Sequence, residues 1–288
     1  MLVSVPSTKP IAGSLRFEPA LGVAASDARL PHLHLGHAPL PQPLRGSVML
    51  LGNFDGLHLG HQALLHRAKT CAAREGRSLS IMACEPHPKQ LFAPDLAPFR
   101  LSCGMARYGR LAEEGLHTVW TPRFDRAFAG LSAQAFVERF LVAEFAVSRV
   151  VVGQDFRFGA GRQGDVDLLE RSGRHWGYLL DVVEDVSEGG VRVSSSLVRQ
   201  LIAAGQVPQA VALLGQPWVV PVACVGAGRY QANPAQLLPP AGIYSVQAKS
   251  RRAAGLGQVT VEITKDRRIT GYLPPQTAAI SWGASARL

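Results

Sequence analysis

The sequence lacks several features that mark membrane, secreted or metal-stabilised proteins. No apolar run approaches the ~20 residues that are needed to cross a bilayer. The N-terminus has no apolar core of a signal peptide, and the acidic residues Glu18 and Asp27 are unusual in a transit peptide. The cysteines form no CxxC pair, which favours reduced thiols in a protein core over disulfides or a zinc site. We therefore expect a cytoplasmic protein without a membrane span. The cysteines expected in the core are Cys71, Cys84, Cys103 and Cys224.

The charge of the chain is positive but not concentrated. The formal net charge is +9, and arginine supplies most of the positive residues. The sequence holds no long block of basic residues and no basic stripe interleaved with aromatic residues, which make up only 7% of the chain. We therefore expect an anionic small molecule such as a nucleotide as the partner, and no nucleic acid.

The chain divides into three segments by composition. Residues 1–45 mix Pro, Ala, Gly, Ser and His without periodicity, so we expect a poorly ordered extension with no chemical role. Residues 46–215 alternate short apolar runs with helical patterns, which predicts an α/β fold with a parallel sheet and helices on both faces. Residues 216–288 contain short β patterns separated by Pro and Gly, which predicts a small β domain.

The stretch GNFDGLHLGH, residues 52–61, follows the apolar run VMLL and precedes an amphipathic helical pattern. If VMLL is a central strand, this loop lies at its carboxyl end, where open α/β sheets place their ligands. Its glycines allow a ligand to approach the backbone, and the free N–H groups of a helix start attract an anion. His58 and His61 could both donate hydrogen bonds to phosphate oxygens that gain charge during phosphoryl or nucleotidyl transfer. We therefore predict a phosphate site here, although a lone histidine is more often a core or surface residue.

A second phosphate site is predicted in SSSLVRQLIAAG, residues 194–205. One serine is enough to cap a helix, so capping leaves two serines and Arg199 unexplained. Hydroxyls, backbone N–H groups and a guanidinium at one helix start suit the β- and γ-phosphates of a triphosphate. Two other segments carry weaker signals. Taken alone, CEPHPKQLF (84–92) is more simply explained as a structural turn, and VVGQDFRFG (151–159) as a strand end with an aromatic anchor.

Together these segments resemble the FAD synthetases. GNFDGLHLGH carries the HxGH signature of the nucleotidyltransferase superfamily. The EPHP loop, the DFRFG segment and the serine-rich helix start follow it in the order found in the FMN adenylyltransferase half of bifunctional riboflavin kinase/FAD synthetases. The resemblance covers residues 46–215 and implies a Rossmann-like sheet. It departs from the family pattern at Cys84 before the EPHP loop and at Ser196, where Thr is usual. The segment LSCGMARYGRL (101–111) lacks a Glu-Lys pair, and we expect it to lie away from the phosphate motifs.

The resemblance implies a reaction and assigns roles to residues. The FMN phosphate attacks the α-phosphorus of ATP, pyrophosphate leaves and FAD forms, with Mg²⁺ bound mainly through the substrate phosphates. Phe54 and His87 are the expected FMN contacts. The expected catalytic residues are His58, His61, Ser195, Ser196 and Arg199. The expected ATP-binding residues are Gly52, Asn53, Gly60, Gly153, Asp155 and Ser194.

The C-terminal segment resembles a truncated riboflavin kinase barrel. The stretch VGAGRYQANPAQLLPPAGIYSVQAK keeps the glycines and GIYSV of that family but lacks its LGFPT core, which holds ATP and Mg²⁺. Glu262 could still occupy the catalytic-base position, but one carboxylate does not rebuild an ATP site. We therefore expect riboflavin kinase activity to be absent and the domain to stabilise or dock, with flavoprotein clients as possible partners.

Two other functions stay open from the sequence. The HxGH motif contacts phosphates and not the acceptor's ring, so a nucleotidyltransferase that acts on a modified flavin is one alternative. The other alternative is a non-catalytic flavin- or nucleotide-binding protein, because the C-terminal region lacks the LGFPT core of a riboflavin kinase. The paired histidines, the serines and Arg199 weigh against the second alternative, because a scaffold has no need of them.

Overall fold

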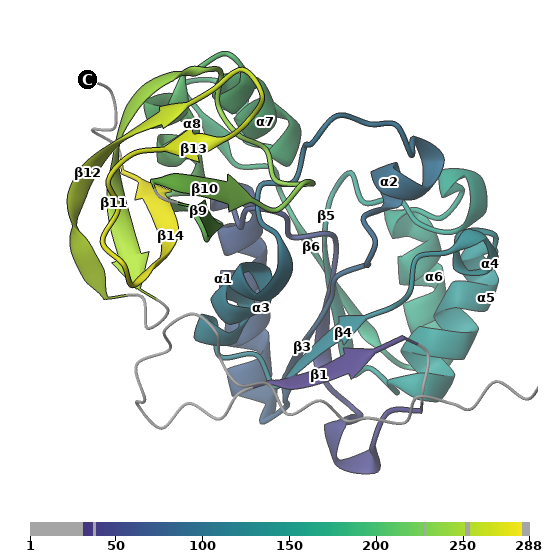
Figure 1. Cartoon of the computed structure of the whole chain (residues 1–288). Helices are drawn as coiled ribbons and strands as arrows, with labels where there is room; N and C mark the ends of the chain where they lie inside the picture. Colours follow the sequence, from purple (N-terminus) through teal and green to yellow (C-terminus); the bar gives the residue numbers. More distant parts are fainter. Residues whose placement is uncertain (1–30, 37–38, 227, 251–253, 284–288) are drawn as a thin grey trace, which may run out of the picture.

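The computed structural model describes residues 31–36, 39–226, 228–250 and 254–283. Within these residues the chain forms a parallel sheet flanked by helices, followed by a closed antiparallel barrel (Figure 1). The sheet has the strand order β1-β4-β3-β2-β5-β6, and each neighbouring pair is parallel. Its strands are β1 (His32–Leu35), β2 (Val48–Leu51), β3 (Leu79–Met82), β4 (Thr118–Thr121), β5 (Arg149–Gly153) and β6 (Leu179–Val183).

The edge strand β1 corrects the expectation that residues 1–45 form a poorly ordered extension. It pairs in register with β4, from His32 opposite Thr118 to Leu35 opposite Thr121. The sequence HLHL is too short to show a periodicity, and an edge strand is held mainly by its backbone ladder, so composition carried no signal. The first part of the expected extension, residues 1–30, lies outside the described residues.

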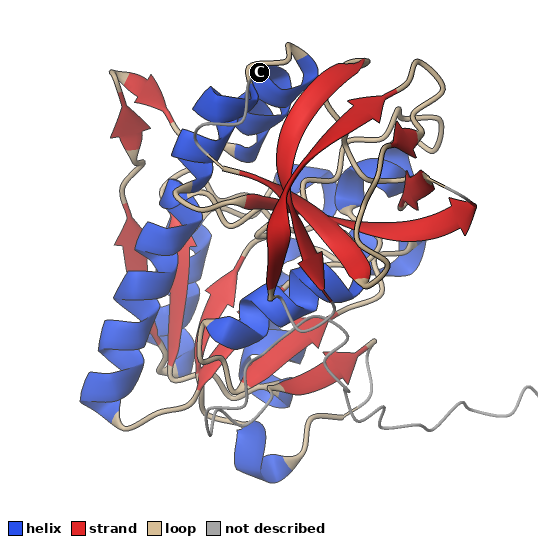
Figure 2. Cartoon of the chain, turned by 60° about the vertical axis from the view of Figure 1, so that its left-hand side comes forward, coloured by secondary structure: helices blue, strands red, loops and turns tan. Residues whose placement is uncertain are grey.

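Helices cover both faces of the sheet, as the sequence predicts (Figure 2). On one face, α1 and α3 pack on apolar side chains of β2 and β3, including Leu50 and Ile81. On the other face, α5, η2 and α6 pack on Leu51 and Trp120. The helices of this domain are α1 (Leu59–Glu75), α2 (Pro88–Phe92), α3 (Gly104–Glu113), α4 (Arg126–Ala129), α5 (Ala133–Phe136), the π-helical η2 (Val137–Glu144), α6 (Val166–Trp176), α7 (Ser195–Ala203) and α8 (Val207–Leu214). Short elements complete it: η1 (Gln42–Leu44), η3 (Ala160–Arg162), β7 (Ser187–Glu188) and β8 (Val191–Arg192).

The predicted helix after residue 58 is α1, and its sequence explains both of its ends. His58 occupies the N-cap position, and its side chain accepts a hydrogen bond from the backbone of His61. Leu65, Ala68, Cys71 and Ala72 recur at three- and four-residue steps and are buried, which fixes the inner face. Gly76 ends the helix in the left-handed conformation with φ of 60°, a conformation that glycine adopts without steric cost.

The C-terminal segment forms a closed barrel with the strand order β10-β13-β12-β11-β14-β9. Its interior is filled by side chains, and the stacked rings of Trp218 and Trp282 have centroids 4.9 Å apart. The same hydrophobic core continues into α7 and α8 through residues such as Val198 and Val211, so packing crosses the domain boundary that the sequence predicts near residue 215. The barrel strands are β9 (Trp218–Gly226), β10 (Arg229–Ala232), β11 (Gly242–Ser250), β12 (Gly255–Ile263), β13 (Ile269–Thr270) and β14 (Thr277–Trp282).

The burial of the cysteines agrees with the prediction from the sequence at three of the four positions. All four thiols are free, and Cys71, Cys84 and Cys103 are buried. Cys224 is exposed on β9, which corrects its expected core position. Alternation along β9 buries Trp218, Val220 and Val222, but it stops before Cys224, because Ala223, Cys224 and Val225 are all exposed at this end of the strand. None of the helices that the structure describes has the length and apolarity to span a membrane.

Candidate active site

The loop between β2 and α1 places two histidines on top of each other. The rings of His58 and His61 stack with centroids 3.7 Å apart, and His58 Nδ1 accepts the backbone N–H of His61 at 3.4 Å. Because Nδ1 is the acceptor, the proton of neutral His58 lies on Nε2 and can be donated to a ligand. Phe54 and Leu57 in the same loop adopt φ of 47°, a strained conformation for residues with a side chain that is concentrated at functional sites.

Both histidines are uncharged at neutral pH. Burial, followed by the positive charge of Arg199, lowers the pKa of His58 from 6.5 to about 4. Burial, followed by the neighbouring His58, lowers the pKa of His61 well below its usual value. The pair therefore offers hydrogen-bond donors that carry no charge of their own, and an incoming phosphate favours their protonation.

The buried carboxylate of Asp55 connects the elements around the site by hydrogen bonds, and the sequence analysis did not select it. It accepts hydrogen bonds from the backbone N–H of Leu101 at 3.1 Å and of Ser102 at 3.0 Å, and from Arg199 Nη2 at 2.8 Å. Burial alone raises the pKa of Asp55, but the charges of Arg100 and Arg199 outweigh it and hold this pKa below its usual value. The signal that could have selected Asp55 was its place in a glycine-rich loop predicted to bind phosphate. A carboxylate is tolerated beside anionic ligands only when a cationic partner holds it, so an acidic residue there indicates a buried ion pair.

The second helix start, at α7, lies against the first loop. Ser194 caps α7 by accepting the N–H of Leu197 at 3.2 Å, and Ser195 Oγ donates to the backbone oxygen of Asp55 at 3.1 Å. Arg199 donates from Nε to the Phe99 carbonyl at 2.8 Å as well as to Asp55. Ser196 is exposed in the first turn of the helix. The two predicted phosphate motifs, far apart in the sequence, therefore meet in the fold.

A cavity of about 180 Å³ lies at this junction. Phe54, Gly52 and Gly60 form part of its wall, and the ring of Phe54 packs against His61 at 5.0 Å and is 1% exposed. Of the predicted site residues, the lining includes Gly52, Phe54, His58, Gly60, His61, Gly153, Asp155 and Ser194. The lining does not include five other predicted site residues, which are Asn53, His87, Ser195, Ser196 and Arg199.

Asp155 carries an ion pair that the sequence analysis did not foresee. Its carboxylate binds Arg192 of β8, whose Nε also lies 2.8 Å from Asp185. Asp155, Asp185 and Arg192 all line the cavity. Arg192 stands two residues before the three serines, so its position next to a predicted phosphate motif was the signal that could have selected it.

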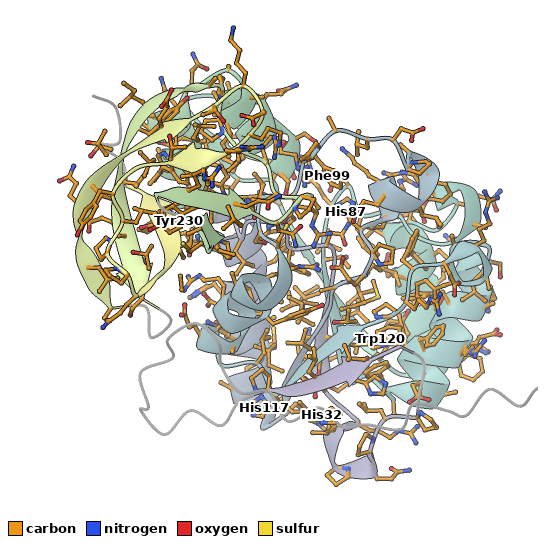
Figure 3. All side chains as sticks on the ribbon, in the orientation of Figure 1. His32, His87, Phe99, His117, Trp120 and Tyr230 are labelled. Carbon is orange, nitrogen blue, oxygen red and sulfur yellow. The ribbon has the colours of Figure 1, made fainter. Side chains whose placement is uncertain are left out.

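His87 and Phe99 lie side by side between α2 and the barrel (Figure 3). His87 is the N-cap of α2, its Nδ1 accepts the N–H of Lys89 at 3.1 Å, and its ring lies edge-on to Phe99 with centroids 5.0 Å apart. Burial, followed by the charge of Arg100, lowers the pKa of His87 to about 3. These contacts give His87 a structural task in the turn, while the nearby Phe92 is 72% exposed at the end of the same helix.

Arg107 corrects the expectation that residues 101–111 lie away from the phosphate motifs. Its guanidinium is buried and donates to the backbone oxygen of Asn53 at 2.7 Å and to Glu85 Oε2 at 2.7 Å. It thereby joins the loop after β2 to the EPHP loop after β3. Arg100 reaches the same carboxylate oxygen of Glu85 at 3.1 Å. No local sequence pattern predicts these contacts, because only the packing of α3 beside both loops creates them.

Comparisons with known proteins identify the family of the chain. The family model described as FAD synthetase matches residues 40–197. The bifunctional riboflavin kinase/FMN adenylyltransferase of Escherichia coli strain K12 is 39% identical over 226 residues, which are 75% of this chain and 71% of the relative. The protein of the same name from Pseudomonas fluorescens is 38% identical, over 77% of this chain and 70% of the relative.

A solved structure has the same fold at lower identity. A protein from Streptococcus pneumoniae, described as a macrolide-efflux protein, superposes with a TM-score of 0.72 over 88% of this chain and 89% of its own. The sequence identity is 22%, so this likeness supports the arrangement of sheet and barrel and nothing about activity. The family match and the relatives carry the assignment, and the chain belongs to the FAD synthetase family.

Proposed function

We propose that the protein is an ATP:FMN adenylyltransferase, which transfers AMP from ATP to FMN and releases pyrophosphate. The observation that carries the proposal is the meeting of two helix starts: the paired histidines of α1 and the N-cap Ser194 of α7 line one cavity, and Ser195 bonds to the loop that holds the histidines. Each helix start offers free N–H groups and the positive end of a helix dipole to an anion. Their junction suits a triphosphate chain, and the family's relatives are named for this reaction.

The chain's own groups act by positioning and by charge stabilisation. A phosphate oxygen of FMN forms a bond to the α-phosphorus while the bond to the β-phosphate oxygen breaks and its electrons leave with pyrophosphate. His58 Nε2–H and the His61 ring donate to oxygens on which charge develops. Arg199 uses Nε and Nη2 for Phe99 and Asp55, so we assign its Nη1 to an oxygen of the departing pyrophosphate. Ser196, exposed on the first turn of α7, is assigned to the same group.

We assign Mg²⁺ to the phosphates of ATP rather than to a protein site. The described residues contain no group of three or more His, Cys, Asp or Glu that could hold a metal ion. Mg²⁺ commonly binds through substrate phosphates and waters with one or two carboxylates, so this donor set fits the assignment. When bound, the ion neutralises charge on the departing phosphates.

The flavin is assigned to the side of the site next to α2. Phe92 is 72% exposed, and its ring lies 6.2 Å from that of Phe124. The exposed Phe92 ring, backed by the partly buried Phe124, provides a surface on which an isoalloxazine ring can stack. On this proposal, His87 acts by holding the turn that presents Phe92, and Phe54 acts by shaping the cavity wall.

We further propose that the barrel has lost riboflavin kinase activity and that the enzyme acts in the cytoplasm, where its four free thiols stay reduced. Glu262, the one acid that could serve as a kinase base, is exposed and accepts a hydrogen bond from Thr270 at 3.3 Å. The support for lost activity is the missing LGFPT stretch between β9 and β11.

One set of incubations tests these assignments. The protein is incubated with ATP and Mg²⁺ and with either FMN or riboflavin, and the products are separated by chromatography. FAD and pyrophosphate from FMN are expected, with no product from riboflavin. Absence of FAD with pure protein would reject the adenylyltransferase, and FMN made from riboflavin would reject the loss of kinase activity. FAD analogues formed only from modified flavins would favour a different acceptor.

A further inference from the structure

Hydrogen bonds from the barrel hold one short segment of the sheet domain, residues 99–102. The buried amide of Gln236, in the loop between β10 and β11, donates from Nε2 to the backbone oxygens of Arg100 and Leu101, both at 3.1 Å. Trp218 Nε1 donates to the same Leu101 oxygen at 2.8 Å. Backbone bonds from Arg100 N–H to Ala235 and from Leu237 N–H to Arg100 extend this contact. The segment is therefore fixed from the barrel side as an added strand would be.

The other side of this segment faces the proposed transfer site. The N–H groups of Leu101 and Ser102 both donate to the Asp55 carboxylate. The carbonyl of Phe99 accepts Arg199 Nε, and the Phe99 ring lies 5.3 Å from the Arg199 guanidinium carbon. Both acceptors that orient Arg199 are therefore held by residues 99–102. A path of direct hydrogen bonds runs from Gln236 through this segment to Asp55 and Arg199.

We propose that the barrel serves as a support for nucleotidyl transfer, with Gln236 as a positioning residue that fixes Arg199 through residues 99–102. The proposal rests on the adenylyltransferase function proposed above and gives the barrel a role that needs no ligand of its own. Gln236 is 0% exposed, and its backbone oxygen accepts Arg267 Nη2 at 2.6 Å. A buried amide keeps its orientation because a lost partner leaves a polar group unsatisfied. Each carbonyl oxygen that Gln236 binds also accepts a second hydrogen bond. Removing the amide therefore weakens the hold on the segment but leaves neither carbonyl without a donor.

The first test replaces the amide and measures kinetics. Gln236→Met keeps the length of the side chain and removes the donor, and Gln236→Asn shortens the reach if the methionine variant does not fold. Gln247→Ala, an exposed glutamine on β11, is the matched control. We expect kcat to fall about tenfold in the Gln236 variant, with the KM values of ATP and FMN within about twofold, as for the loss of a group that acts in the transition state. An unchanged kcat, or an equal fall in the control, would overturn the proposal.

A double variant separates positioning of Arg199 from a general loss of structure. If Gln236 acts through Arg199, then Gln236→Met in an Arg199→Ala background lowers kcat no further, because the group it positions is gone. A further tenfold fall in that background would show an independent effect and would reject the proposed path.

Hydrogen exchange provides a readout that does not depend on activity. In Gln236→Met, the amides of Leu101 and Ser102 should exchange about tenfold faster, while amides of β2 and β5 keep their wild-type rates. If the wild type makes no FAD, the proposed function fails, and this measurement still decides whether Gln236 orders the segment. Unchanged exchange at Leu101 and Ser102 would overturn the inference even in an active enzyme.

Discussion

The sheet domain and the barrel place their charged residues in opposite ways. In the sheet domain, Asp55, Arg100 and Arg107 are 1%, 3% and 2% exposed and meet beneath the loop after β2. In the barrel, the described charged residues, from Arg229 to Arg268, are all at least partly exposed. Buried ion pairs often contribute less stability than apolar residues of the same size would, because the charges lose their hydration. The buried charges of the sheet domain are therefore better explained by the site they build than by stability.

The barrel is organised around packing instead. Its interior holds aromatic and aliphatic side chains, with the Trp218 and Trp282 rings stacked at 4.9 Å. Its polar contribution to the site is a neutral amide and an indole N–H, which orient backbone groups at low electrostatic cost. The two regions thus divide the work: one provides charge at the reaction centre and the other provides rigidity. The predictions below test this division.

The largest expected effect is on stability, from removing Asp55. Asp55→Ala should lower the free energy of unfolding by about 3 to 5 kcal/mol, because it removes the buried carboxylate that pairs with Arg199 and leaves Arg100 with Glu85 as its countercharge. Urea denaturation gives this value. Asp266→Ala, which removes an exposed acid of the barrel paired with Arg268, should cost less than about 1 kcal/mol. Similar losses in the two variants would show that the charge of the sheet domain is no more critical than that of the barrel.

The next effect is on turnover, from the histidine pair. His61→Ala should lower kcat by about 10²-fold or more, because it removes a donor to oxygens that gain charge in the transition state. His117, whose Nδ1 accepts the N–H of Leu79, lies at the far end of the sheet (Figure 3) and provides the control. FAD formation is measured under saturating ATP and FMN. A larger KM with normal kcat in His61→Ala would assign the ring to substrate binding alone.

How far the sequence could predict these features depends on the range of the contacts. The parallel sheet, the β domain and both phosphate motifs follow from local patterns: VMLL before a glycine-rich loop, and three serines before an amphipathic helix. Asp55, Arg107 and Gln236 could not be selected in this way. Their roles arise from partners that are distant in the sequence, such as Asn53 for Arg107 and Leu101 for Gln236. The edge strand β1 was missed for a different reason, since the alternation in its four residues HLHL is too short to be recognised as a strand pattern.

A smaller effect is expected from pH. Burial lowers the pKa of His58 to about 4 and of His87 to about 3, from 6.5 in the unfolded chain, so the unfolded state binds more protons between these values. Stability is therefore lost as the pH falls below about 6.5, and each histidine should cost about 2 kcal/mol between pH 7 and pH 5. Urea denaturation at pH 5, 6 and 7 measures the slope. His87→Gln should reduce the loss of unfolding free energy between pH 7 and pH 5 by about 2 kcal/mol, the contribution of one histidine. An unchanged slope would contradict the burial of a neutral His87.

The smallest effect is expected at the one acid of the barrel that resembles a kinase base. Glu262 is exposed on β12 and contacts Thr270 through a 3.3 Å hydrogen bond. Glu262→Gln should change the free energy of unfolding by less than about 0.5 kcal/mol, as is usual for surface substitutions. FAD formation from FMN should also keep its wild-type kcat, because Glu262 is not among the residues that hold segment 99–102. Assays with FMN and with riboflavin, run side by side on both proteins, give the sharpest form of the comparison. Suppose that the wild-type protein phosphorylates riboflavin and that Glu262→Gln does not. The barrel would then have a catalytic site of its own, and the division of charge and rigidity between the two regions would no longer hold.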